Sequence, residues 1–313
     1  MKFALSAEQK DFAASIDALL ADADTVSTNR LWAEGKPEAG LKIWRSLAGL
    51  GVTALGVPGK FGGPDATPAD LVVAFEQLGF HAVPGPWVDT VAVLPSLLQD
   101  EALVAVAAGE ALASVVAAPH VPYALDADVA DIRISVDSDG LREFTARRRL
   151  TSVDASRRLF ETTTGGRRSG EPDMARAFNL GALATAAVQL GAGRWLLNTS
   201  VSYAKQRRQY GKAIGSYQAI KHLLADVVTS LDFATPLVYA AAVTLDDRDV
   251  SAAKVAAGRA STLAARTGLQ VHGALGYTAE YPLGLRLTKI RALTGAWGTP
   301  AFHRSRVLRA VAS

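Results

Sequence analysis

The residues best suited to chemistry in this chain lie in one polar stretch, SYAKQRRQYGKAIGSYQAIKH, which covers residues 202–222. An arginine such as Arg207 presents a planar, permanently charged fork that suits phosphate oxygens. Gly211 lets the main chain approach a ligand closely, and the amide of Gln218 can pair with a ring edge or a hydroxyl. The stretch therefore predicts a site for an anion, or else a solvated turn between two helices.

A second stretch of similar composition, QVHGALGYTAEYP, runs from Gln270 to Pro282. Other common catalytic patterns are absent from the sequence, including the GxSxG elbow, the P-loop and HExxH. The chain has no cysteine, which excludes thiolate nucleophiles and zinc–sulfur sites. No two of the five histidines are spaced i,i+4, and no metal site is expected on them: His81, His120, His222, His272 and His303.

The elements that must position these stretches are mostly helices. Ser6 and Gln9 have the spacing of a capping box, and Phe12, Ile16 and Leu19 repeat behind them at helical spacing. Further helices are predicted over residues 43–52, 69–80 and 102–118, the last running up to Pro119. A Gly- and Pro-rich loop at 57–68 separates the first two.

The middle of the chain has a different pattern. DIRISVDSDG (131–140) alternates apolar and polar residues, and RRLFETTTGG (157–166) is similar, so both predict strands. From Asp173 onward the pattern is helical again, and long alanine-rich helices with short loops predict an up-down bundle. The predicted helices cover 174–206, 220–231, 251–273 with Ser251 as cap, and roughly 282–297.

The predicted fold class is therefore mainly α, with an N-terminal helical domain (1–118), a small β domain (119–172) and a C-terminal helical bundle (173–313). The chain has 313 residues, 49% hydrophobic and 20% charged, which is the balance of a soluble globular protein. Its net charge of +3 does not imply a polyanionic partner. The arginine clusters at 147–149 and 167–168 lack interleaved aromatic residues, so nucleic-acid binding is not expected. A cytoplasmic protein without a membrane span is expected, because the apolar run at 102–118 is too short to cross a bilayer.

Together and in this order, the two polar stretches resemble motifs of the acyl-CoA dehydrogenase family. The loop and helix at 57–79 resemble the family's Pro–Gly–Gly loop, so the resemblance extends over nearly the whole chain. The pattern R-x-x-F/Y-G, with a glutamine eleven residues after the arginine, matches Arg207, Tyr210, Gly211 and Gln218. The patterns Q-x-x-G-x-x-G-[YF] and E-Y-P match Gln270, Gly273, Gly276, Tyr277 and the segment 280–282.

The resemblance implies N-terminal helices, a central β domain and a C-terminal four-helix bundle, with FAD as cofactor and an acyl-CoA thioester as substrate. In this family a glutamate removes the α-proton, the β-hydrogen passes as hydride to the flavin, and an electron-accepting flavoprotein or similar partner is implied. The arginine and glutamine motifs contact the FAD of a neighbouring subunit across an interface. The implied cofactor-binding residues are Arg207, Gln209, Tyr210, Gln218, Gln270, Gly273, Gly276 and Thr299.

Two departures from the family pattern concern the active site. The usual base, the glutamate of an E-G-T motif, is replaced by Trp297, and the alternative position on the long helix holds Gly181. The central domain is short, without a counterpart of the threonine- or serine-containing strand motif that holds the flavin ring. These departures favour the non-catalytic half-site subunit of a heterotetramer (α2β2) that acts on a steroid-derived or other bulky acyl-CoA, as in actinobacterial steroid-degrading members of the family.

Two alternatives stay open. The chain could be a self-sufficient homomeric dehydrogenase with a relocated base, for which Glu280 is the candidate. It could also be a helical scaffold subunit without flavin.

Overall fold

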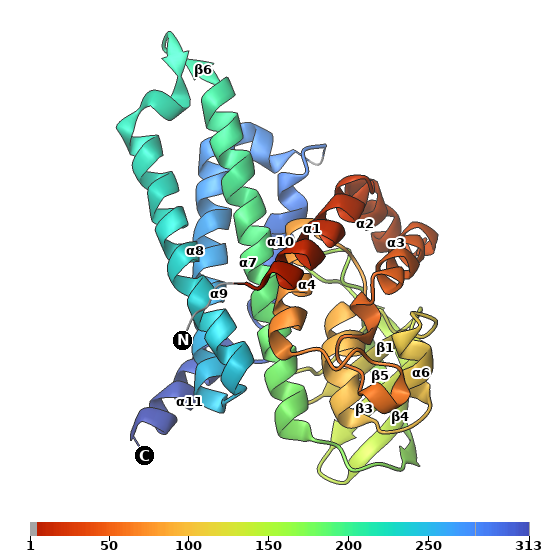
Figure 1. Ribbon diagram of the computed structural model, residues 1–313. Helices are drawn as coiled ribbons and strands as arrows, with labels where there is room; N and C mark the ends of the chain where they lie inside the picture. Colours follow the sequence, from red (N-terminus) through yellow and green to blue (C-terminus); the bar gives the residue numbers. More distant parts are fainter. Residues whose placement is uncertain (1–4, 279, 313) are drawn as a thin grey trace.

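The computed structural model describes residues 5–278 and 280–312, which fold into N-terminal helices, a small sheet and a long helical bundle (Figure 1). The predicted capping box of the first helix is confirmed, because Ser6 and Gln9 each accept a hydrogen bond from the other's backbone N–H, at 3.2 and 3.1 Å. The N-terminal part consists of α1 (Ala7–Ala21), α2 (Thr25–Ala33), α3 (Glu38–Gly49), α4 (Pro68–Phe80), a π-helical segment (Val88–Val93), α5 (Leu94–Leu97) and α6 (Ala102–Ala107).

The sheet has five strands in the order β1-β3-β4-β5-β2. β1 pairs with β3 in parallel, and the other pairings are antiparallel. The strands predicted over 131–140 and 157–166 are confirmed as β3 and β5. The strands are β1 (Ala113–Ala117), β2 (Ala124–Leu125), β3 (Ile132–Asp137), β4 (Gly140–Leu150) and β5 (Leu159–Arg168).

The helix predicted over 102–118 is wrong in its second half. α6 ends at Ala107, Gly109 adopts a φ of 74°, and the residues from Ala113 onward form β1. A short apolar run reads equally as a buried strand or a buried helix, and a parallel strand that is covered on both faces needs no alternation.

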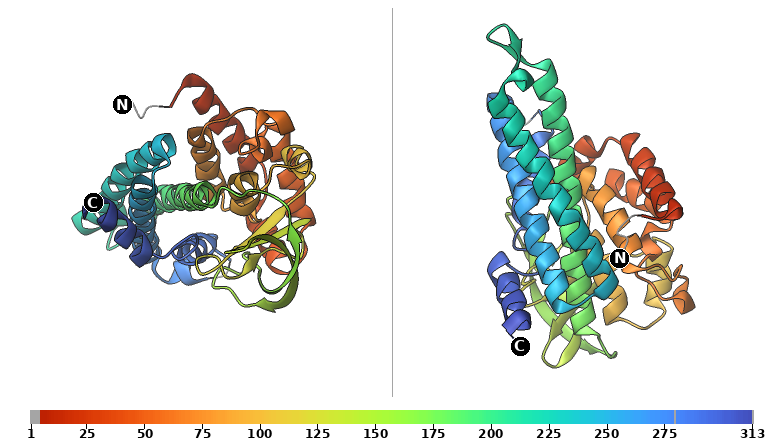
Figure 2. Two further views of the ribbon diagram at one scale, coloured as in Figure 1. Left: turned by 90° about the horizontal axis from the view of Figure 1, so that it is seen from below. Right: turned by 60° about the vertical axis from the view of Figure 1, so that its left-hand side comes forward.

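The bundle contains α7 (Met174–Gln206), α8 (Gln218–Thr244), α9 (Asp247–His272), α10 (Leu283–Leu293) and α11 (Pro300–Ala312). Figure 2 shows the first three of these side by side along their lengths. The prediction that Ser251 caps a helix is wrong, because α9 begins four residues earlier with Asp247 in its first turn, where an acidic side chain favours the helix dipole. The predicted helix over 282–297 ends at Leu293, and α11 follows it.

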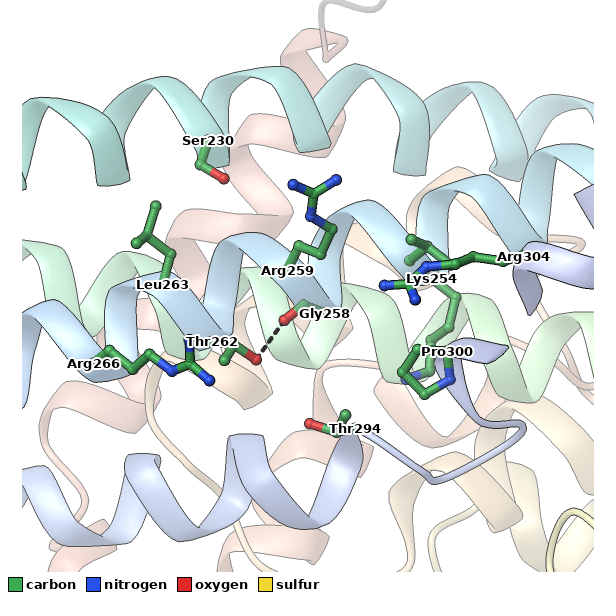
Figure 3. Close-up of a pocket in the computed structure, with 11 residues that line it drawn as sticks. Ser230, Lys254, Gly258, Arg259, Thr262, Leu263, Arg266, Thr294, Pro300 and Arg304 are labelled. Atoms are coloured by element: carbon green, nitrogen blue, oxygen red, sulfur yellow. Dashed lines mark hydrogen bonds between the residues drawn. The ribbon is translucent and has the colours of Figure 1, made fainter. Parts of the chain in front are cut away.

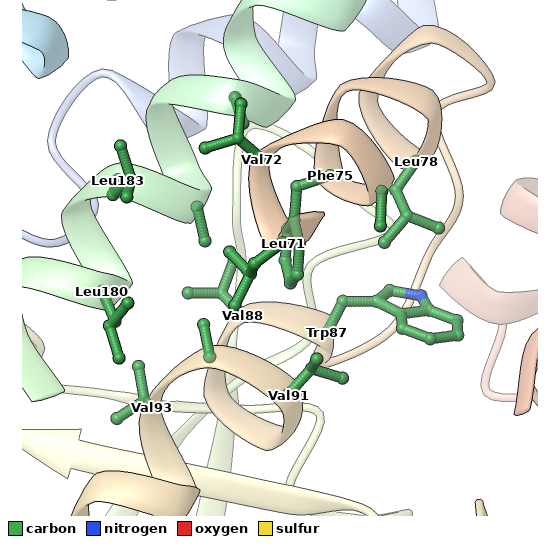
Figure 4. Close-up of a cluster of buried hydrophobic side chains, with 14 of the residues drawn as sticks. Leu71, Val72, Phe75, Leu78, Trp87, Val88, Val91, Val93, Leu180 and Leu183 are labelled. Atoms are coloured by element: carbon green, nitrogen blue, oxygen red, sulfur yellow. The ribbon is translucent and has the colours of Figure 1, made fainter. Parts of the chain in front are cut away.

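The N-terminal helices share one hydrophobic core with the bundle. Figure 4 shows side chains of α4, among them Leu71 and Val72, facing Leu180 and Leu183 of α7. Glycine lets the two helices approach closely, since a Cβ added at Gly191 would lie 1.8 Å from the backbone oxygen of Glu76. This contact fixes α7, the longest helix, against the rest of the molecule.

One helix of the described chain, α8, is long and apolar enough to span a membrane by length and composition. It packs against α9 and α7 in the bundle, as the core helix of a soluble protein also does. The feature is therefore weak evidence for a membrane span.

Candidate functional site

The first predicted motif forms a hairpin at one end of the bundle (Figure 1). Arg207 follows the last residue of α7, and its carbonyl oxygen accepts a hydrogen bond of 2.8 Å from the N–H of Ile214. Between them, β6 (Arg208–Gln209) and β7 (Lys212–Ala213) pair through a two-residue turn. Tyr210 and Gly211 both have positive φ, at 51° and 81°, as a hairpin turn of this length requires.

The side chains of this hairpin are directed to solvent and are available to an external group. Tyr210 is 93% exposed. Arg207, Gln209 and Gln218 are exposed too, and their side chains make no hydrogen bond or ion pair within residues 5–278 and 280–312. An exposed guanidinium beside an open glycine turn fits the phosphate group of a ligand or of a ligand held by another chain.

The second motif lies where α9 ends. Gln270 is exposed on the last turn, and Gly273 is exposed with a φ of 59°. A Cβ added at Gly273 would meet nothing within 4 Å, so a ligand has room to approach the main chain there. Gly276 has a packing role instead, because a Cβ there would lie 3.0 Å from side-chain carbons of Leu269 and Leu283.

His272 joins the two motifs at this end of the bundle. Its ring stacks on Tyr203 of α7 with 4.4 Å between the ring centroids. Nδ1 lies 2.8 Å from the carbonyl oxygen of Gly268, and since a carbonyl only accepts, Nδ1 is the donor. Nε2 then accepts from the hydroxyl of Tyr281, 3.2 Å away. Burial lowers the pKa of His272, which favours this neutral form. No pattern in the sequence predicted that His272 positions the two motifs.

At the other end of the bundle the structure brings Gly181 and Trp297 together. The indole is 4% exposed, and a Cβ added at Gly181 would lie only 2.5 Å from its Cδ2 atom. The indole thus occupies the space that a side chain at position 181 would need. The two positions at which the resemblance implies a base are therefore in contact, and neither residue has a group that can accept a proton at neutral pH.

His303 holds the Trp297 loop in place. Its Nε2 donates to the carbonyl oxygen of Trp297 at 2.9 Å, so Nδ1 is the acceptor for the hydroxyl of Ser251 at 3.1 Å. Burial lowers the pKa of His303 to about 4, which keeps the ring neutral. A Cβ added at Gly298 would lie 2.5 Å from Nε2, so only glycine fits beside the imidazole.

The remaining candidates are Thr299, in the loop after Trp297, and Glu280. Thr299 is exposed, and its hydroxyl oxygen accepts from the N–H of Phe302 at 3.2 Å, at the start of α11. Glu280 is exposed and precedes α10, whereas Trp297 follows that helix. An 11-residue helix is about 16 Å long, so Glu280 and Trp297 lie near opposite ends of α10. Within residues 5–278 and 280–312, no group of three or more His, Cys, Asp and Glu could hold a metal ion.

The two ends of the bundle are far apart. Gly181 and Arg207 are 26 positions apart (207 − 181) along α7 and its last cap. At 1.5 Å per residue, about 39 Å separates them along the helix axis. One chain therefore presents its two sets of predicted site residues to different places.

Comparison with known proteins decides the family. Residues 168–312 match the sequence profile of the acyl-CoA dehydrogenase C-terminal domain. Over 270 residues the chain is 33% identical to acyl-CoA dehydrogenase IpdE2 of Mycolicibacterium smegmatis, and the alignment covers 82% of this chain and 84% of that protein. The chain belongs to the acyl-CoA dehydrogenase family. Membership supports an oxidoreductase acting on an acyl-CoA.

The fold of this family member agrees with solved acyl-CoA dehydrogenase structures. The ChsE4–ChsE5 complex of Mycobacterium tuberculosis contains a chain with a TM-score of 0.83 at 21% identity, covering 100% of this chain and 99% of that one. A variant of the Tcur3481–Tcur3483 steroid acyl-CoA dehydrogenase gives 0.83 at 19% identity, covering 97% and 98%. The mainly α fold with a shortened central β region is confirmed.

Proposed function

We propose that this chain is the half-site subunit, without a catalytic base, of a heteromeric FAD-dependent acyl-CoA dehydrogenase. The observation that carries the proposal is the contact of Trp297 with Gly181, which fills both of the usual base positions with groups that cannot take a proton. A positioned base contributes about 10²–10⁴ in rate. In this proposal the partner subunit supplies that base, and the complex catalyses α,β-dehydrogenation of the acyl-CoA.

The length of α7 supports a site shared between chains. Because about 39 Å separates the residue at 181 from the one at 207, the hairpin end and the Trp297 end of one chain do not face the same cofactor. In our proposal this chain contributes its hairpin end to an FAD whose other contacts come from the partner. Two of the solved neighbours, ChsE4–ChsE5 and Tcur3481–Tcur3483, combine two differently named proteins, which supports a heteromeric assembly that we propose to be α2β2.

The residues at the hairpin end would bind the cofactor rather than react. FAD supplies the hydride acceptor when it is bound. The guanidinium of Arg207 would donate to the phosphate oxygens, and the amides of Gln218 and Gln270 would bind the adenosine part. Gln209, Tyr210 and Gly273 remain proposed FAD contacts at this end, and Gly276 would support them through its packing. Thr299 lies at the Trp297 end and would contact FAD in the self-sufficient alternative. We place the complex in the cytoplasm, with an electron-accepting flavoprotein or similar protein as its second partner.

The substrate class follows by analogy. The Tcur3481–Tcur3483 neighbour is a steroid acyl-CoA dehydrogenase, and we propose a steroid-derived or other bulky acyl-CoA for the complex of this chain. The proposal is tested by assaying steroid-CoA dehydrogenation with the chain alone and together with its partner.

Flavin content per chain tests the half-site proposal directly. The chain purified alone should be colourless, and a complex co-expressed with genomic neighbours should hold about one FAD for every two chains by visible absorbance. Arg207→Gln should weaken FAD binding by the complex about 10- to 100-fold, since a charge-assisted hydrogen bond contributes ~1.5–3 kcal/mol. Arg147→Gln, an exposed arginine on β4, is the matched control and should leave FAD binding unchanged.

Other outcomes favour the alternatives. A yellow lone chain, with one FAD that is reduced by an acyl-CoA, would favour a self-sufficient enzyme, and loss of turnover in Glu280→Gln would then identify the relocated base. A complex without any flavin would favour a scaffold subunit.

A further inference from the structure

A basic cavity of about 370 Å³ lies between α8, α9, α10 and α11 (Figure 3). This volume is within the range of ~300–1,000 Å³ typical of small-molecule sites. Four basic side chains line it, from two helices that α10 separates in the sequence. These are Lys254, Arg259 and Arg266 of α9 and Arg304 of α11.

The charges of this cavity are not balanced by acids. No aspartate or glutamate is among the residues that line it. Arg259, Arg266 and Arg304 have no hydrogen-bond or ion-pair partner anywhere in the part of the chain that the structure describes. An arginine on a protein surface is usually solvated, but several cations around one cavity without a counterion raise the local potential and attract an anion.

The inner wall of the cavity has buried donors that an anion would satisfy. Lys254 is 3% exposed, and its ammonium contacts only neutral acceptors, the side-chain oxygen of Gln189 at 3.1 Å and the carbonyl oxygen of Leu293 at 2.9 Å. Gln189 is fully buried, and its Nε2 donates to no acceptor within the described residues. This side-chain amide lies 3.7 Å from the position of a Cβ at Gly258, which lines the cavity. A buried cation without a negatively charged partner is costly, and an anion nearby would offset that cost.

The start of α11 adds a further positive contribution. Pro300, the first residue of this 13-residue helix, lines the cavity. The N-terminus of a helix carries a partial positive charge and unpaired N–H groups that bind anions. In this cavity the partial positive charge of the helix N-terminus adds to the charges of the side chains that line it.

We propose that this cavity binds the diphosphate group of a nucleotide. The guanidinium groups of Arg259 and Arg266 can each pair with phosphate oxygens. The buried amine of Lys254 provides an inner donor whose charged form a bound anion would favour, and Ser230 of α8 provides a hydroxyl at the opposite wall. The proposal goes beyond the proposed function, because it concerns a second site on this chain whose residues are not among those of the hairpin end.

The test measures the affinity of the full chain for inorganic pyrophosphate by isothermal titration calorimetry at constant ionic strength. Arg259→Gln and Arg266→Gln should each weaken binding about tenfold, because each removes a charge-assisted pair. Arg147→Gln removes an exposed arginine elsewhere and should leave the affinity unchanged. Circular dichroism of each variant checks that the fold is retained, which is expected because all three arginines are exposed.

Titrations with ADP, CoA and FAD then show which nucleotide the cavity prefers. The nucleotide that binds more tightly than pyrophosphate is identified as the ligand. Sulfate at the same ionic strength should bind much more weakly. The proposal is overturned if pyrophosphate binds no better than sulfate, or if the double variant of Arg259 and Arg266 binds it as tightly as Arg147→Gln. Neither result would affect the half-site proposal, which is decided by the flavin content of the complex.

Discussion

Compared with a glutamate at the usual base positions, Trp297 and Gly181 change both the chemistry and the volume of the side chains at one place. A carboxylate at position 297 could titrate and take a proton, whereas an indole only donates through its N–H. The large ring also needs a glycine opposite, and the chain has one there. The two replacements therefore depend on each other, and the Trp297 end of the bundle is a packed core rather than an incomplete active site.

This interdependence predicts the effect of one methyl group. Gly181→Ala should lower the free energy of unfolding by about 1–3 kcal/mol, because the new Cβ would overlap the indole in a packed core. Urea denaturation measures the change. Gly284→Ala is the matched control, since a Cβ on that helical glycine meets nothing within 4 Å and should raise stability by up to about 1 kcal/mol. Equal stability of Gly181→Ala and the wild type would mean that Trp297 does not fill this space.

Lys254 predicts a pH dependence of stability. Burial, with a smaller contribution from the charge of Arg157, lowers its pKa from an ordinary 10.5 to about 7. Between these values the unfolded chain binds one more proton than the folded chain, so the free energy of unfolding should rise as the pH rises from about 7 to about 10.5. Lys254→Met should remove this part of the rise in urea denaturation at several pH values. The same slope in the variant and the wild type would show that Lys254 is charged in the folded protein at neutral pH.

At the scale of elements, local patterns predicted most of the helices. Residue spacing over short stretches was enough to predict the capping box at Ser6, the helix of 174–206 and the strands β3 and β5. The strand β1 did not follow, because its apolar residues fit a helix equally well and only pairing with β3 selects the strand. The same division holds for the site. The motifs of the hairpin end could be predicted from the sequence, but their link through His272 depends on tertiary packing.

Removing the hairpin β6–β7 should weaken FAD binding by the complex with little effect on the stability of the chain. The N–H of Ile214 lies 2.8 Å from the carbonyl oxygen of Arg207, so two glycines can replace residues 208–213 without moving α7 or α8. Because most of these residues are exposed, the free energy of unfolding of the chain should change by less than about 0.5 kcal/mol. FAD content of the complex should fall strongly, as measured by absorbance. Full flavin content in this variant would remove the hairpin from the proposed cofactor site.

At the scale of the whole molecule, buried polar links tie the β layer to the bundle. Asp154, in the segment between β4 and β5, accepts hydrogen bonds from Lys289 of α10 at 3.1 Å and from the hydroxyl of Ser156 at 2.7 Å. Burial raises the pKa of Asp154, but Lys289 and Ser156 outweigh that effect and hold the pKa below its ordinary value. α10 also ends four residues before Trp297, so this link helps to set where the Trp297 loop begins.

A double-mutant cycle tests how strongly this link couples the two layers. Asp154→Asn and Lys289→Met should each cost about 3–5 kcal/mol, because each leaves one buried charge without its partner. The double variant should be more stable than the sum of the single changes predicts, with a coupling energy of about 0.5–3 kcal/mol in urea denaturation. Since the folded pKa of Asp154 is lowered, its contribution is present at neutral pH and is lost as the pH falls through that value. Additive effects would show that the Asp154–Lys289 pair does not couple the sheet to the bundle.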